Sequence, residues 1–162
     1  TRAVDFVIGA CLCLRRDALE TVEHVFDEHF FMFYEETDLC RRLRDESWTV
    51  WFVDDSSVTH LGGTSYRDSV GTVNREVYAH RMRSRFLYHR KYGTPLSTFI
   101  LAGAFVVTGV IRLLLLAIIL PFLPEAKRLA GCFHIQKACL DIQLAPRAFR
   151  AALAPNLDMR RA

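Results

Sequence analysis

The sequence lacks the cysteine spacing of a zinc-binding module. Its five cysteines form neither an even set nor a paired C-x-x-C pattern, which excludes the common zinc frameworks. The sequence also has no internal repeat and no low-complexity tract, which argues against a repeat architecture. Because free cysteines are among the most buried residue types, we expect reduced and mostly buried thiols at Cys11, Cys13, Cys40, Cys132 and Cys139.

Acidic residues are scarce in the second half of the sequence. Residues 79–162 contain 13 Lys and Arg but only 3 Asp and Glu, a net charge of +10, whereas residues 1–78 contain 8 and 15, a net charge of −7. A chain of 162 residues with 51% hydrophobic content can bury one ordinary core. The division of charge therefore predicts an acidic part and a basic part with different tasks.

Charge is almost absent from residues 96–120, where Arg112 is the one charged side chain and Pro95 and Pro121 mark the ends. As a helix this segment would be roughly 37 Å long, enough to cross a hydrocarbon core of about 30 Å. A helix buried in a soluble core would normally be shorter. Basic residues on both sides favour the cytoplasmic face for both ends, so an interfacial or re-entrant placement stays open beside a spanning one. The flanking residues are Arg81, Arg83, Arg85, Arg90 and Lys91 before the segment and Lys127, Arg128 and Lys137 after it.

Local patterns predict the order of the elements. Apolar runs with partial alternation predict strands, and leucines four residues apart behind a turn rich in acids predict a helix. The first residue is Thr1, no signal peptide opens the chain, and the first apolar run resembles an internal strand, so we expect the later part of a longer protein. The expected elements are a buried strand over 3–14, a short helix over 15–22 opened by Asp17, a helix over 35–46, a strand, turn and strand over 48–63, and a basic helix over 74–92 that Gly93 ends.

The stretch FFMFYEETDLCRRL places three acids directly behind a run of aromatic residues. Like charges this close repel, and apolar neighbours raise the pKa of a carboxyl group, which suits a general base. The acids also lie where they would stabilise the start of a helix. Asp38 could in addition pair with Arg41 or Arg42, three and four residues along. Both a catalytic and a structural role are therefore open for Glu35 and Glu36.

These motifs together resemble the second half of the catalytic domain in family-2 glycosyltransferases, especially the rhamnosyltransferase-like enzymes of bacterial surface polysaccharides. The resemblance covers about residues 7–92. In that family a GA…RR strand and helix precede an FDE-FF-Y-ED-DL--R segment, a GW-V strand and an H-GG-S element. The matching residues are Gly9, Ala10, Arg15, Arg16, Phe26, Asp27, Glu28, Phe30, Phe31, Tyr34, Glu35, Asp38, Leu39, Arg42, Trp48, His60, Gly62, Gly63 and Ser65.

The resemblance implies an α/β fold class. The chain would hold the C-terminal portion of a GT-A, Rossmann-like nucleotide-sugar transferase domain, followed by apolar and amphipathic helices. We therefore expect the acceptor-side half of that domain over residues 1–92, a hydrophobic membrane-associated helix over 93–125 and a basic helical tail over 126–162.

The resemblance also implies the reaction. A sugar hydroxyl would attack the anomeric carbon of a nucleoside-diphosphate sugar with inversion, which needs a base at the acceptor and positive charge at the leaving group. The acceptor would be a saccharide or a lipid-linked sugar at the cytoplasmic face of the membrane, and the cofactor a divalent cation, Mn²⁺ or Mg²⁺. The implied roles are the base for Glu36, substrate binding for Glu35, Asp38, Tyr34 and Arg42, and metal binding for His60.

The sequence departs from the family pattern at several positions. Glu36 stands where the family usually has Asp, His24 where a Gly is common, and Ser47 replaces the Gly before the Trp. The family's Asp-x-Asp metal motif is absent from these residues, and a single histidine such as His60 is more often structural. The aromatic run could be core instead of a sugar platform, with Tyr34 the best candidate for substrate contact.

Two other functions stay open at this point. A small membrane-anchored structural or assembly protein would share the apolar segment. A nucleic-acid-binding module would use the basic residues 81–91, but apolar sequence follows them and the first half is acidic, so we expect no nucleic-acid partner.

Overall fold

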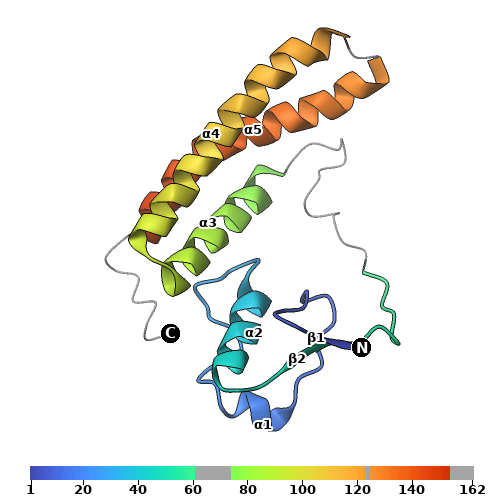
Figure 1. Ribbon diagram of the computed structural model, residues 1–162, viewed down its shortest axis with the longest axis vertical. Coiled ribbons are helices and arrows are strands. Elements are labelled where there is room, and N and C mark those ends of the chain that lie inside the picture. The colour runs from blue at the N-terminus through green and yellow to red at the C-terminus, as the bar shows by residue number, and fades with distance from the viewer. Residues whose placement is uncertain (61–73, 123–124, 154–162) are drawn as a thin grey trace.

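The computed structural model describes residues 1–60, 74–122 and 125–153, and these are mostly helical (Figure 1). Three long helices form one part, and the short strands with the helices nearer the N-terminus form the other. In chain order the elements are β1 (Arg2–Val4), α1 (Arg16–Leu19), α2 (Glu35–Asp45), β2 (Val50–Phe52), α3 (Arg75–Tyr92), α4 (Pro95–Ile119), the 3-10 turn η1 (Leu120–Phe122) and α5 (Glu125–Ala152).

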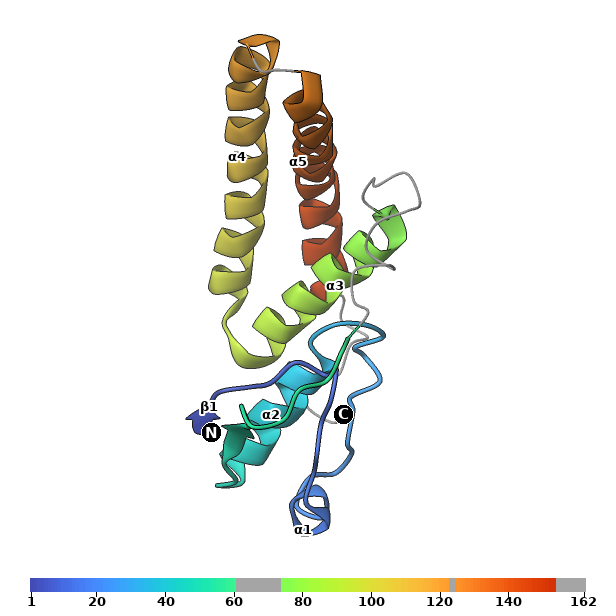
Figure 2. The same cartoon turned by 90° about the vertical axis from the view of Figure 1, so that its right-hand side faces the viewer.

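Helices α4 and α5 form an antiparallel hairpin, and α3 crosses its lower part (Figure 2). The core of this part lies where the three helices meet, around Phe86 and Leu87, which are 0% and 1% exposed. A Cβ at Gly109 would lie 2.8 Å from Cγ1 of Ile142 and 3.1 Å from the carbonyl oxygen of Ala138. Gly109 therefore allows α4 to approach α5 more closely than any other residue would.

The boundary between α3 and α4 has the predicted form. Asn74 caps α3, because its side chain accepts hydrogen bonds from two backbone N–H groups of the first turn. Gly93 ends α3, and a Cβ there would lie 2.5 Å from the carbonyl oxygen of His89. Thr94 and Ser97 then form a capping box for α4, with Pro95 in its first turn. The predictions of a basic helix ending at Gly93 and of an apolar helix after it are confirmed.

The N-terminal part is built around α2. Leu39 and Leu43, at i and i+4, are buried against Ala18 of α1, with Trp48 beside them. The predicted helix over 35–46 is confirmed. Strands β1 and β2 pair antiparallel, with Arg2 opposite Phe52 and Val4 opposite Val50.

Several predictions for the N-terminal part are wrong. The expected strand over 3–14 shortens to β1, and no second strand follows β2 among the described residues up to His60. Helix α1 begins at Arg16 behind Arg15, not at Asp17. A strand forms only with a partner, and in the described residues the one pairing is β1 with β2. This single pairing of two short strands does not test the α/β fold class or the domain limits, which stay predictions.

The prediction of mostly buried thiols is wrong for half of the described cysteines. Cys40 is buried in α2 and Cys139 is half-buried in α5, but Cys11 and Cys13 are exposed. Their segment is irregular chain instead of the expected buried strand, so their side chains are not enclosed. Cys132 lies outside the residues whose side chains are described.

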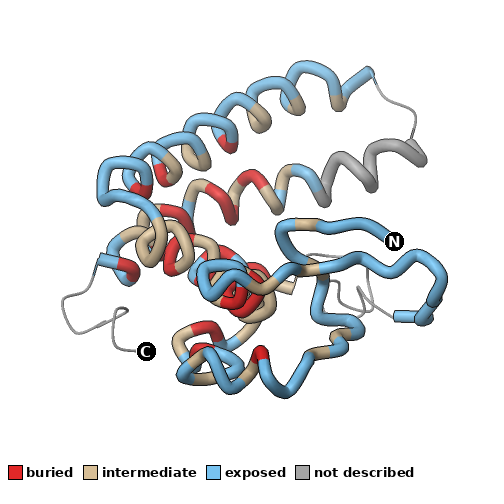
Figure 3. Tube along the Cα trace, turned by 60° about the horizontal axis from the view of Figure 1, so that its bottom comes forward, coloured by how far each residue is buried: buried red, intermediate tan, exposed pale blue. Residues whose placement is uncertain are grey.

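The outer side of α4 is exposed (Figure 3), and the exposed side chains there are mostly apolar. The helix turns Thr98, Ala102 and Gly109 inward. It is long and apolar enough to cross a membrane, with a mean hydropathy of 2.5 over its most apolar window. Soluble monomers rarely expose so large a continuous apolar surface. This surface comprises Leu96, Phe99, Ile100, Val107, Val110, Ile111, Leu114, Leu115, Ile118 and Ile119.

Candidate active site

A pocket of about 360 Å³ lies at the start of α2. Its acidic wall is Glu35 and Glu36, the first two residues of the helix. Its other walls are apolar. Phe31 is 71% exposed, whereas Phe30 is 5% exposed and belongs to the core between the helices. The remaining lining residues are Gly9, Leu12 and Phe26.

Two residues directly before α2 have a left-handed backbone conformation, which sets the direction in which the chain enters the helix. Phe33 has φ 68° and Tyr34 has φ 72°, a conformation that costs on the order of 1–3 kcal/mol for each residue that is not glycine. Helix α3 holds the turn in place. Nε of Arg85 donates to the Tyr34 hydroxyl at 2.9 Å, and the Ser84 hydroxyl donates to the carbonyl oxygen of Met32 at 2.7 Å. The two acids are thus positioned by a strained turn that tertiary contacts maintain.

The carboxylates of the pocket have unused hydrogen-bonding capacity. The backbone N–H of Gly9 donates to Oε1 of Glu36 at 3.4 Å. Oε2 of Glu35 and Oε2 of Glu36 are both buried, and neither has a hydrogen-bond partner in the described part of the chain. Burial raises the pKa of Glu35, and the neighbouring charge of Glu36 raises it further, against a hydrogen bond from its own backbone that lowers it. The buried oxygens of both residues can therefore accept hydrogen bonds from hydroxyl groups, and the raised pKa of Glu35 favours uptake of a proton there.

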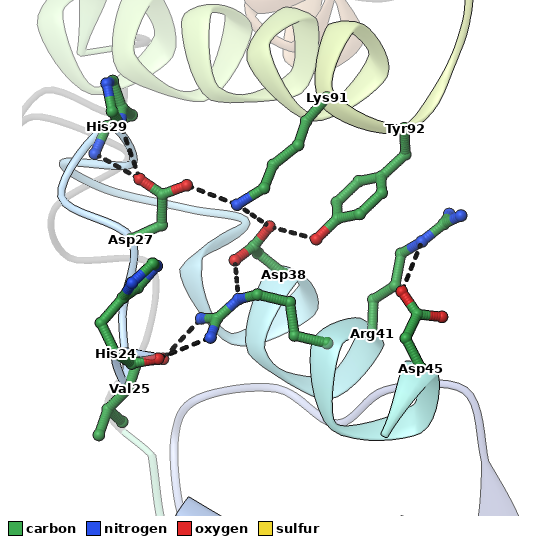
Figure 4. A network of polar contacts seen from close by, with 10 residues as sticks. His24, Val25, Asp27, His29, Asp38, Arg41, Asp45, Lys91 and Tyr92 are labelled. Atoms are coloured by element: carbon green, nitrogen blue, oxygen red, sulfur yellow. Dashed lines mark hydrogen bonds and ion pairs between the residues drawn. The ribbon is translucent and has the colours of Figure 1, made fainter. Parts of the chain in front are cut away.

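A second cluster of charges, the α2–α3 junction, joins the two parts of the fold (Figure 4). It consists of Asp27, Asp38, Arg42, Lys91 and Tyr92. Lys91 Nζ lies 2.6 Å from Oδ2 of Asp27 and 3.0 Å from Oδ1 of Asp38. Asp38 is 0% exposed and also accepts hydrogen bonds from Tyr92 at 2.7 Å and Arg42 at 2.8 Å. The expected pairing of Asp38 with Arg42 four residues along is therefore present.

The junction is closed by contacts to the chain before α2. Arg42 donates to the carbonyl oxygens of His24 at 2.6 Å and Val25 at 2.8 Å. Burial and the hydrogen bond to Asp38 together raise the pKa of Tyr92 far above its usual value, which keeps Tyr92 a donor. Asp38 and Arg42 therefore have a structural role in the α2–α3 junction, because their contacts fix α2 to α3 and to the chain before α2.

Asp27 should make the fold sensitive to acid. Burial alone would raise its pKa, but the hydrogen bond and charge of Lys91, with two hydrogen bonds from His29, lower it from 3.8 to about 2. A lowered carboxyl pKa contributes stability above the unfolded value, and this stability is lost as the pH falls through the folded value. We expect the parental chain to lose part of its free energy of unfolding between about pH 4 and pH 2.

Thermal unfolding across this pH range measures the effect. Asp27→Asn should be less stable than the parent at neutral pH, and the difference should shrink towards pH 2. Asp45→Asn is the control, because the Asp45 side chain is 64% exposed and should show little difference at any pH. A constant difference between Asp27→Asn and the parent from pH 7 to pH 2 would show that Asp27 does not titrate in this way.

The structure separates the residues predicted for one site into three places. Glu35 and Glu36 line the pocket, and Tyr34 directly precedes them. Asp38 and Arg42 lie in the α2–α3 junction and are not among the residues that line the pocket. Their predicted contact with substrate stays a prediction.

His60 is exposed at the end of the described segment 1–60. Within the described residues no three His, Cys, Asp or Glu side chains come close enough to hold a metal ion. The described residues thus do not supply a site for the predicted Mn²⁺ or Mg²⁺. The glycines and serine that follow His60 in the predicted element, Gly62, Gly63 and Ser65, lie outside the described residues.

The sequence did not reveal the residues that hold this site together. In the sequence, Lys91 and Arg85 were only two of several basic residues before the apolar segment. Lys91 reaches Asp27 across 64 residues of chain, and Arg85 reaches Tyr34 across 51. No local spacing could have indicated these pairs. The predicted pairing of Asp38 with Arg42 was the local signal for part of the α2–α3 junction.

Comparison with known proteins gives a partial match. Over 59 residues the chain is 39% identical to N-acetylglucosaminyl-diphospho-decaprenol L-rhamnosyltransferase of Mycobacterium tuberculosis, in the strains CDC 1551 / Oshkosh and ATCC 25618 / H37Rv. The match covers 36% of this chain and 19% of the relative, so the chain spans only a small fraction of the length of the curated relatives it matches. No family model and no solved structure matches the sequence. This short similarity relates the chain to glycosyltransferases.

Proposed function

We propose that this chain is the acceptor-side part of an inverting glycosyltransferase of the GT-A type. It would transfer a sugar from a nucleoside-diphosphate sugar to a saccharide or lipid-linked acceptor in surface-polysaccharide or cell-wall synthesis. The observation that carries the proposal is the pair Glu35 and Glu36, which line an aromatic pocket, each with one buried oxygen that has no hydrogen-bond partner among the described residues. The partial similarity to a rhamnosyltransferase supports the same reaction class.

The pocket suggests how the acceptor reacts. Glu36 takes the proton of the acceptor hydroxyl, and that oxygen forms a bond to the anomeric carbon as the bond to the nucleoside diphosphate breaks. Glu35 accepts hydrogen bonds from neighbouring hydroxyls, and the exposed ring of Phe31 offers an apolar surface for the sugar. Departure of the diphosphate requires positive charge near its oxygens. The described residues at this pocket provide no metal site that would supply this charge.

Transfer of a labelled sugar tests the proposal. Membranes from cells that carry the gene for this chain would be supplied with labelled nucleoside-diphosphate sugars, rhamnose first. Label should enter the lipid-extractable fraction or the polysaccharide. The substitution Glu36→Gln is made in the chromosome, so that the chain is tested in the protein as the cell makes it. It should abolish most of that incorporation, because glutamine cannot take the proton of the acceptor. Unchanged incorporation would contradict the assignment.

We further infer that the protein rests on the cytoplasmic face of a membrane through the outer side of α4. The exposed residues of α4 form one apolar side, while the opposite side packs on α5. Arg81 and Arg85 of α3 line a pocket with Phe105 and Arg112 near the middle of α4. A perpendicular crossing would carry these arginines into the hydrocarbon core at a high cost. An interfacial hairpin avoids that cost and fits the basic residues at both ends.

Acidic substitutions on this surface should release the protein from membranes. We expect Leu114→Glu combined with Ile118→Glu to lower sedimentation with membranes by about tenfold or more, since each leucine-sized contact contributes roughly 1.5–3 kcal/mol. Val53→Glu with Val58→Glu is the matched control, because both valines are exposed in the N-terminal part. High salt should extract the parent only partly, since apolar contacts are not screened. Membrane binding unchanged in the α4 variant would exclude this surface.

A further inference from the structure

A second pocket, of about 120 Å³, lies between α3, α4 and α5. Four cationic side chains line it, two from α3 and one from each of the other helices. Among the described residues, the one carboxylate that lines it is Asp141 of α5. Among the described side chains that line the pocket, cations therefore outnumber carboxylates. The cations are Arg81, Arg85, Arg112 and Lys137.

The single carboxylate is already engaged. Asp141 is 2% exposed, and one of its oxygens accepts a hydrogen bond from the hydroxyl of Tyr78. Its other oxygen lies 3.2 Å from Nη1 of Arg112. Asp141 therefore offsets the charge of Arg112 and ties the three helices together. It does not offset the positive charge on the α3 side of the pocket.

On this side of the pocket, the contacts of Arg85 with described residues are to a hydroxyl and an aromatic ring, which are neutral groups. Arg85 donates to the Tyr34 hydroxyl and lies 5.1 Å from the ring centre of Phe105, and Arg81 lies 5.9 Å from the ring centre of Phe33. A guanidinium beside rings and hydroxyls keeps its charge and presents donors in a fixed plane. The arrangement suits a tetrahedral oxyanion, which arginines bind through paired hydrogen bonds.

The size of the pocket agrees with a phosphate group. One water occupies about 30 Å³ of liquid, so a pocket of about 120 Å³ holds a few waters or one such anion. It is too small for a nucleotide, since pockets for drug-sized ligands measure about 300–1,000 Å³. Met82 and Phe105 form apolar walls that strengthen the electrostatic attraction.

The neighbouring surface indicates where the phosphate comes from. Thr108 and Arg112 line the pocket, and the exposed apolar residues Val107, Ile111 and Leu115 adjoin them along α4. An anion held here therefore sits at the margin of the apolar side of α4. A lipid carries its phosphate next to a hydrocarbon chain, so it can contact both the pocket and the apolar side of α4. Free phosphate can contact the pocket alone.

We propose that this pocket binds the phosphate group of a lipid whose hydrocarbon chain lies along the outer side of α4. Arg85 connects this pocket with the start of α2, because it donates to the hydroxyl of Tyr34, the residue before Glu35. A sugar attached to the lipid phosphate would then extend towards Glu35 and Glu36. This last step rests on the proposed function, but the binding site itself does not.

Flotation of the full chain with vesicles tests the site. The vesicles contain phosphatidylcholine with either phosphatidic acid or, at matched surface charge, oleic acid. The parent should bind the phosphatidic acid vesicles about tenfold more tightly, as expected for charge-assisted hydrogen bonds to phosphate. Arg112→Gln and Lys137→Gln should each remove most of this preference. Arg83→Gln and Arg147→Gln, which remove an exposed charge from α3 and α5, should retain it.

Three results would overturn the proposal. The parent could bind both kinds of vesicle equally, the two control variants could lose as much preference as the pocket variants, or soluble pyrophosphate could bind the chain as tightly as the phosphatidic acid vesicles. Lys137 is half-buried, so Lys137→Gln tests the pocket even if Arg112→Gln fails to fold. Lipid preference without sugar transfer would refute the proposed function alone, and sugar transfer without lipid preference would refute this site alone.

Discussion

Replacing Glu36 by Gln should lower kcat by about 10²–10⁴ while donor affinity stays nearly constant. Glutamine keeps the shape of the side chain and its hydrogen bond from the Gly9 N–H, but it cannot take a proton. Under the proposed function Glu36 contacts the acceptor and not the donor, so only the chemical step should suffer. Steady-state kinetics of the protein in membranes, with donor binding measured separately, gives both quantities.

Two further variants separate catalysis from helix stability. Glu36→Asp should keep much of the activity, because aspartate is the residue that the family pattern has at this position. Glu46→Gln removes the same charge at the exposed end of α2 and should leave kcat unchanged. If the acids served only to stabilise the start of α2, Glu36→Gln would cost a few tenths to about 1 kcal/mol of stability and little activity.

Asp38→Asn distinguishes the pocket from the α2–α3 junction. Asp38 is fully buried between Lys91, Arg42 and Tyr92, so its substitution should destabilise the fold more than it lowers the kcat of the folded enzyme. A loss of kcat at Asp38 larger than that at Glu36, with stability unchanged, would move the base two residues along α2.

Replacing Lys91 by Met should destabilise the protein by about 3–5 kcal/mol. The Lys91 side chain is 10% exposed and lies between two carboxylates that are both 0% exposed. Methionine has a similar length but no charge, so Asp27 and Asp38 would face each other without the shared cation. For a chain of this size the apparent Tm should fall by on the order of 10 °C.

Thermal unfolding of the detergent-solubilised protein measures the effect. Arg83→Met is the control, since Arg83 lies on the same helix and is exposed. Adding Asp27→Asn to Lys91→Met should recover part of the loss, because one uncompensated charge is removed. A Tm for Lys91→Met equal to that of the parent would show that the α2–α3 junction does not hold the two parts together.

Part of the candidate site could be predicted from the sequence. Glu35 and Glu36 stood out because three acids follow an aromatic run, and they do share a pocket. The same pattern suggested Asp38 and Arg42, whose side chains lie in the α2–α3 junction instead. Successive residues of a helix point in different directions, so nearness in the sequence did not place all of these acids on one surface.

The sequence by itself determined the helices α2, α3 and α4. Acids in the first turn, a capping asparagine, Gly93 and Pro95 act within a few residues, so their effects could be read locally. The apolar character of α4 was evident from residues 96–120, where Arg112 is the one charged side chain. Only the tertiary structure decided the extent of the strands, the left-handed turn at Phe33 and Tyr34, and the contacts of Lys91 and Arg85. Each of these depends on partners far along the chain, and no local spacing specifies which distant residue will supply the hydrogen bond or the charge.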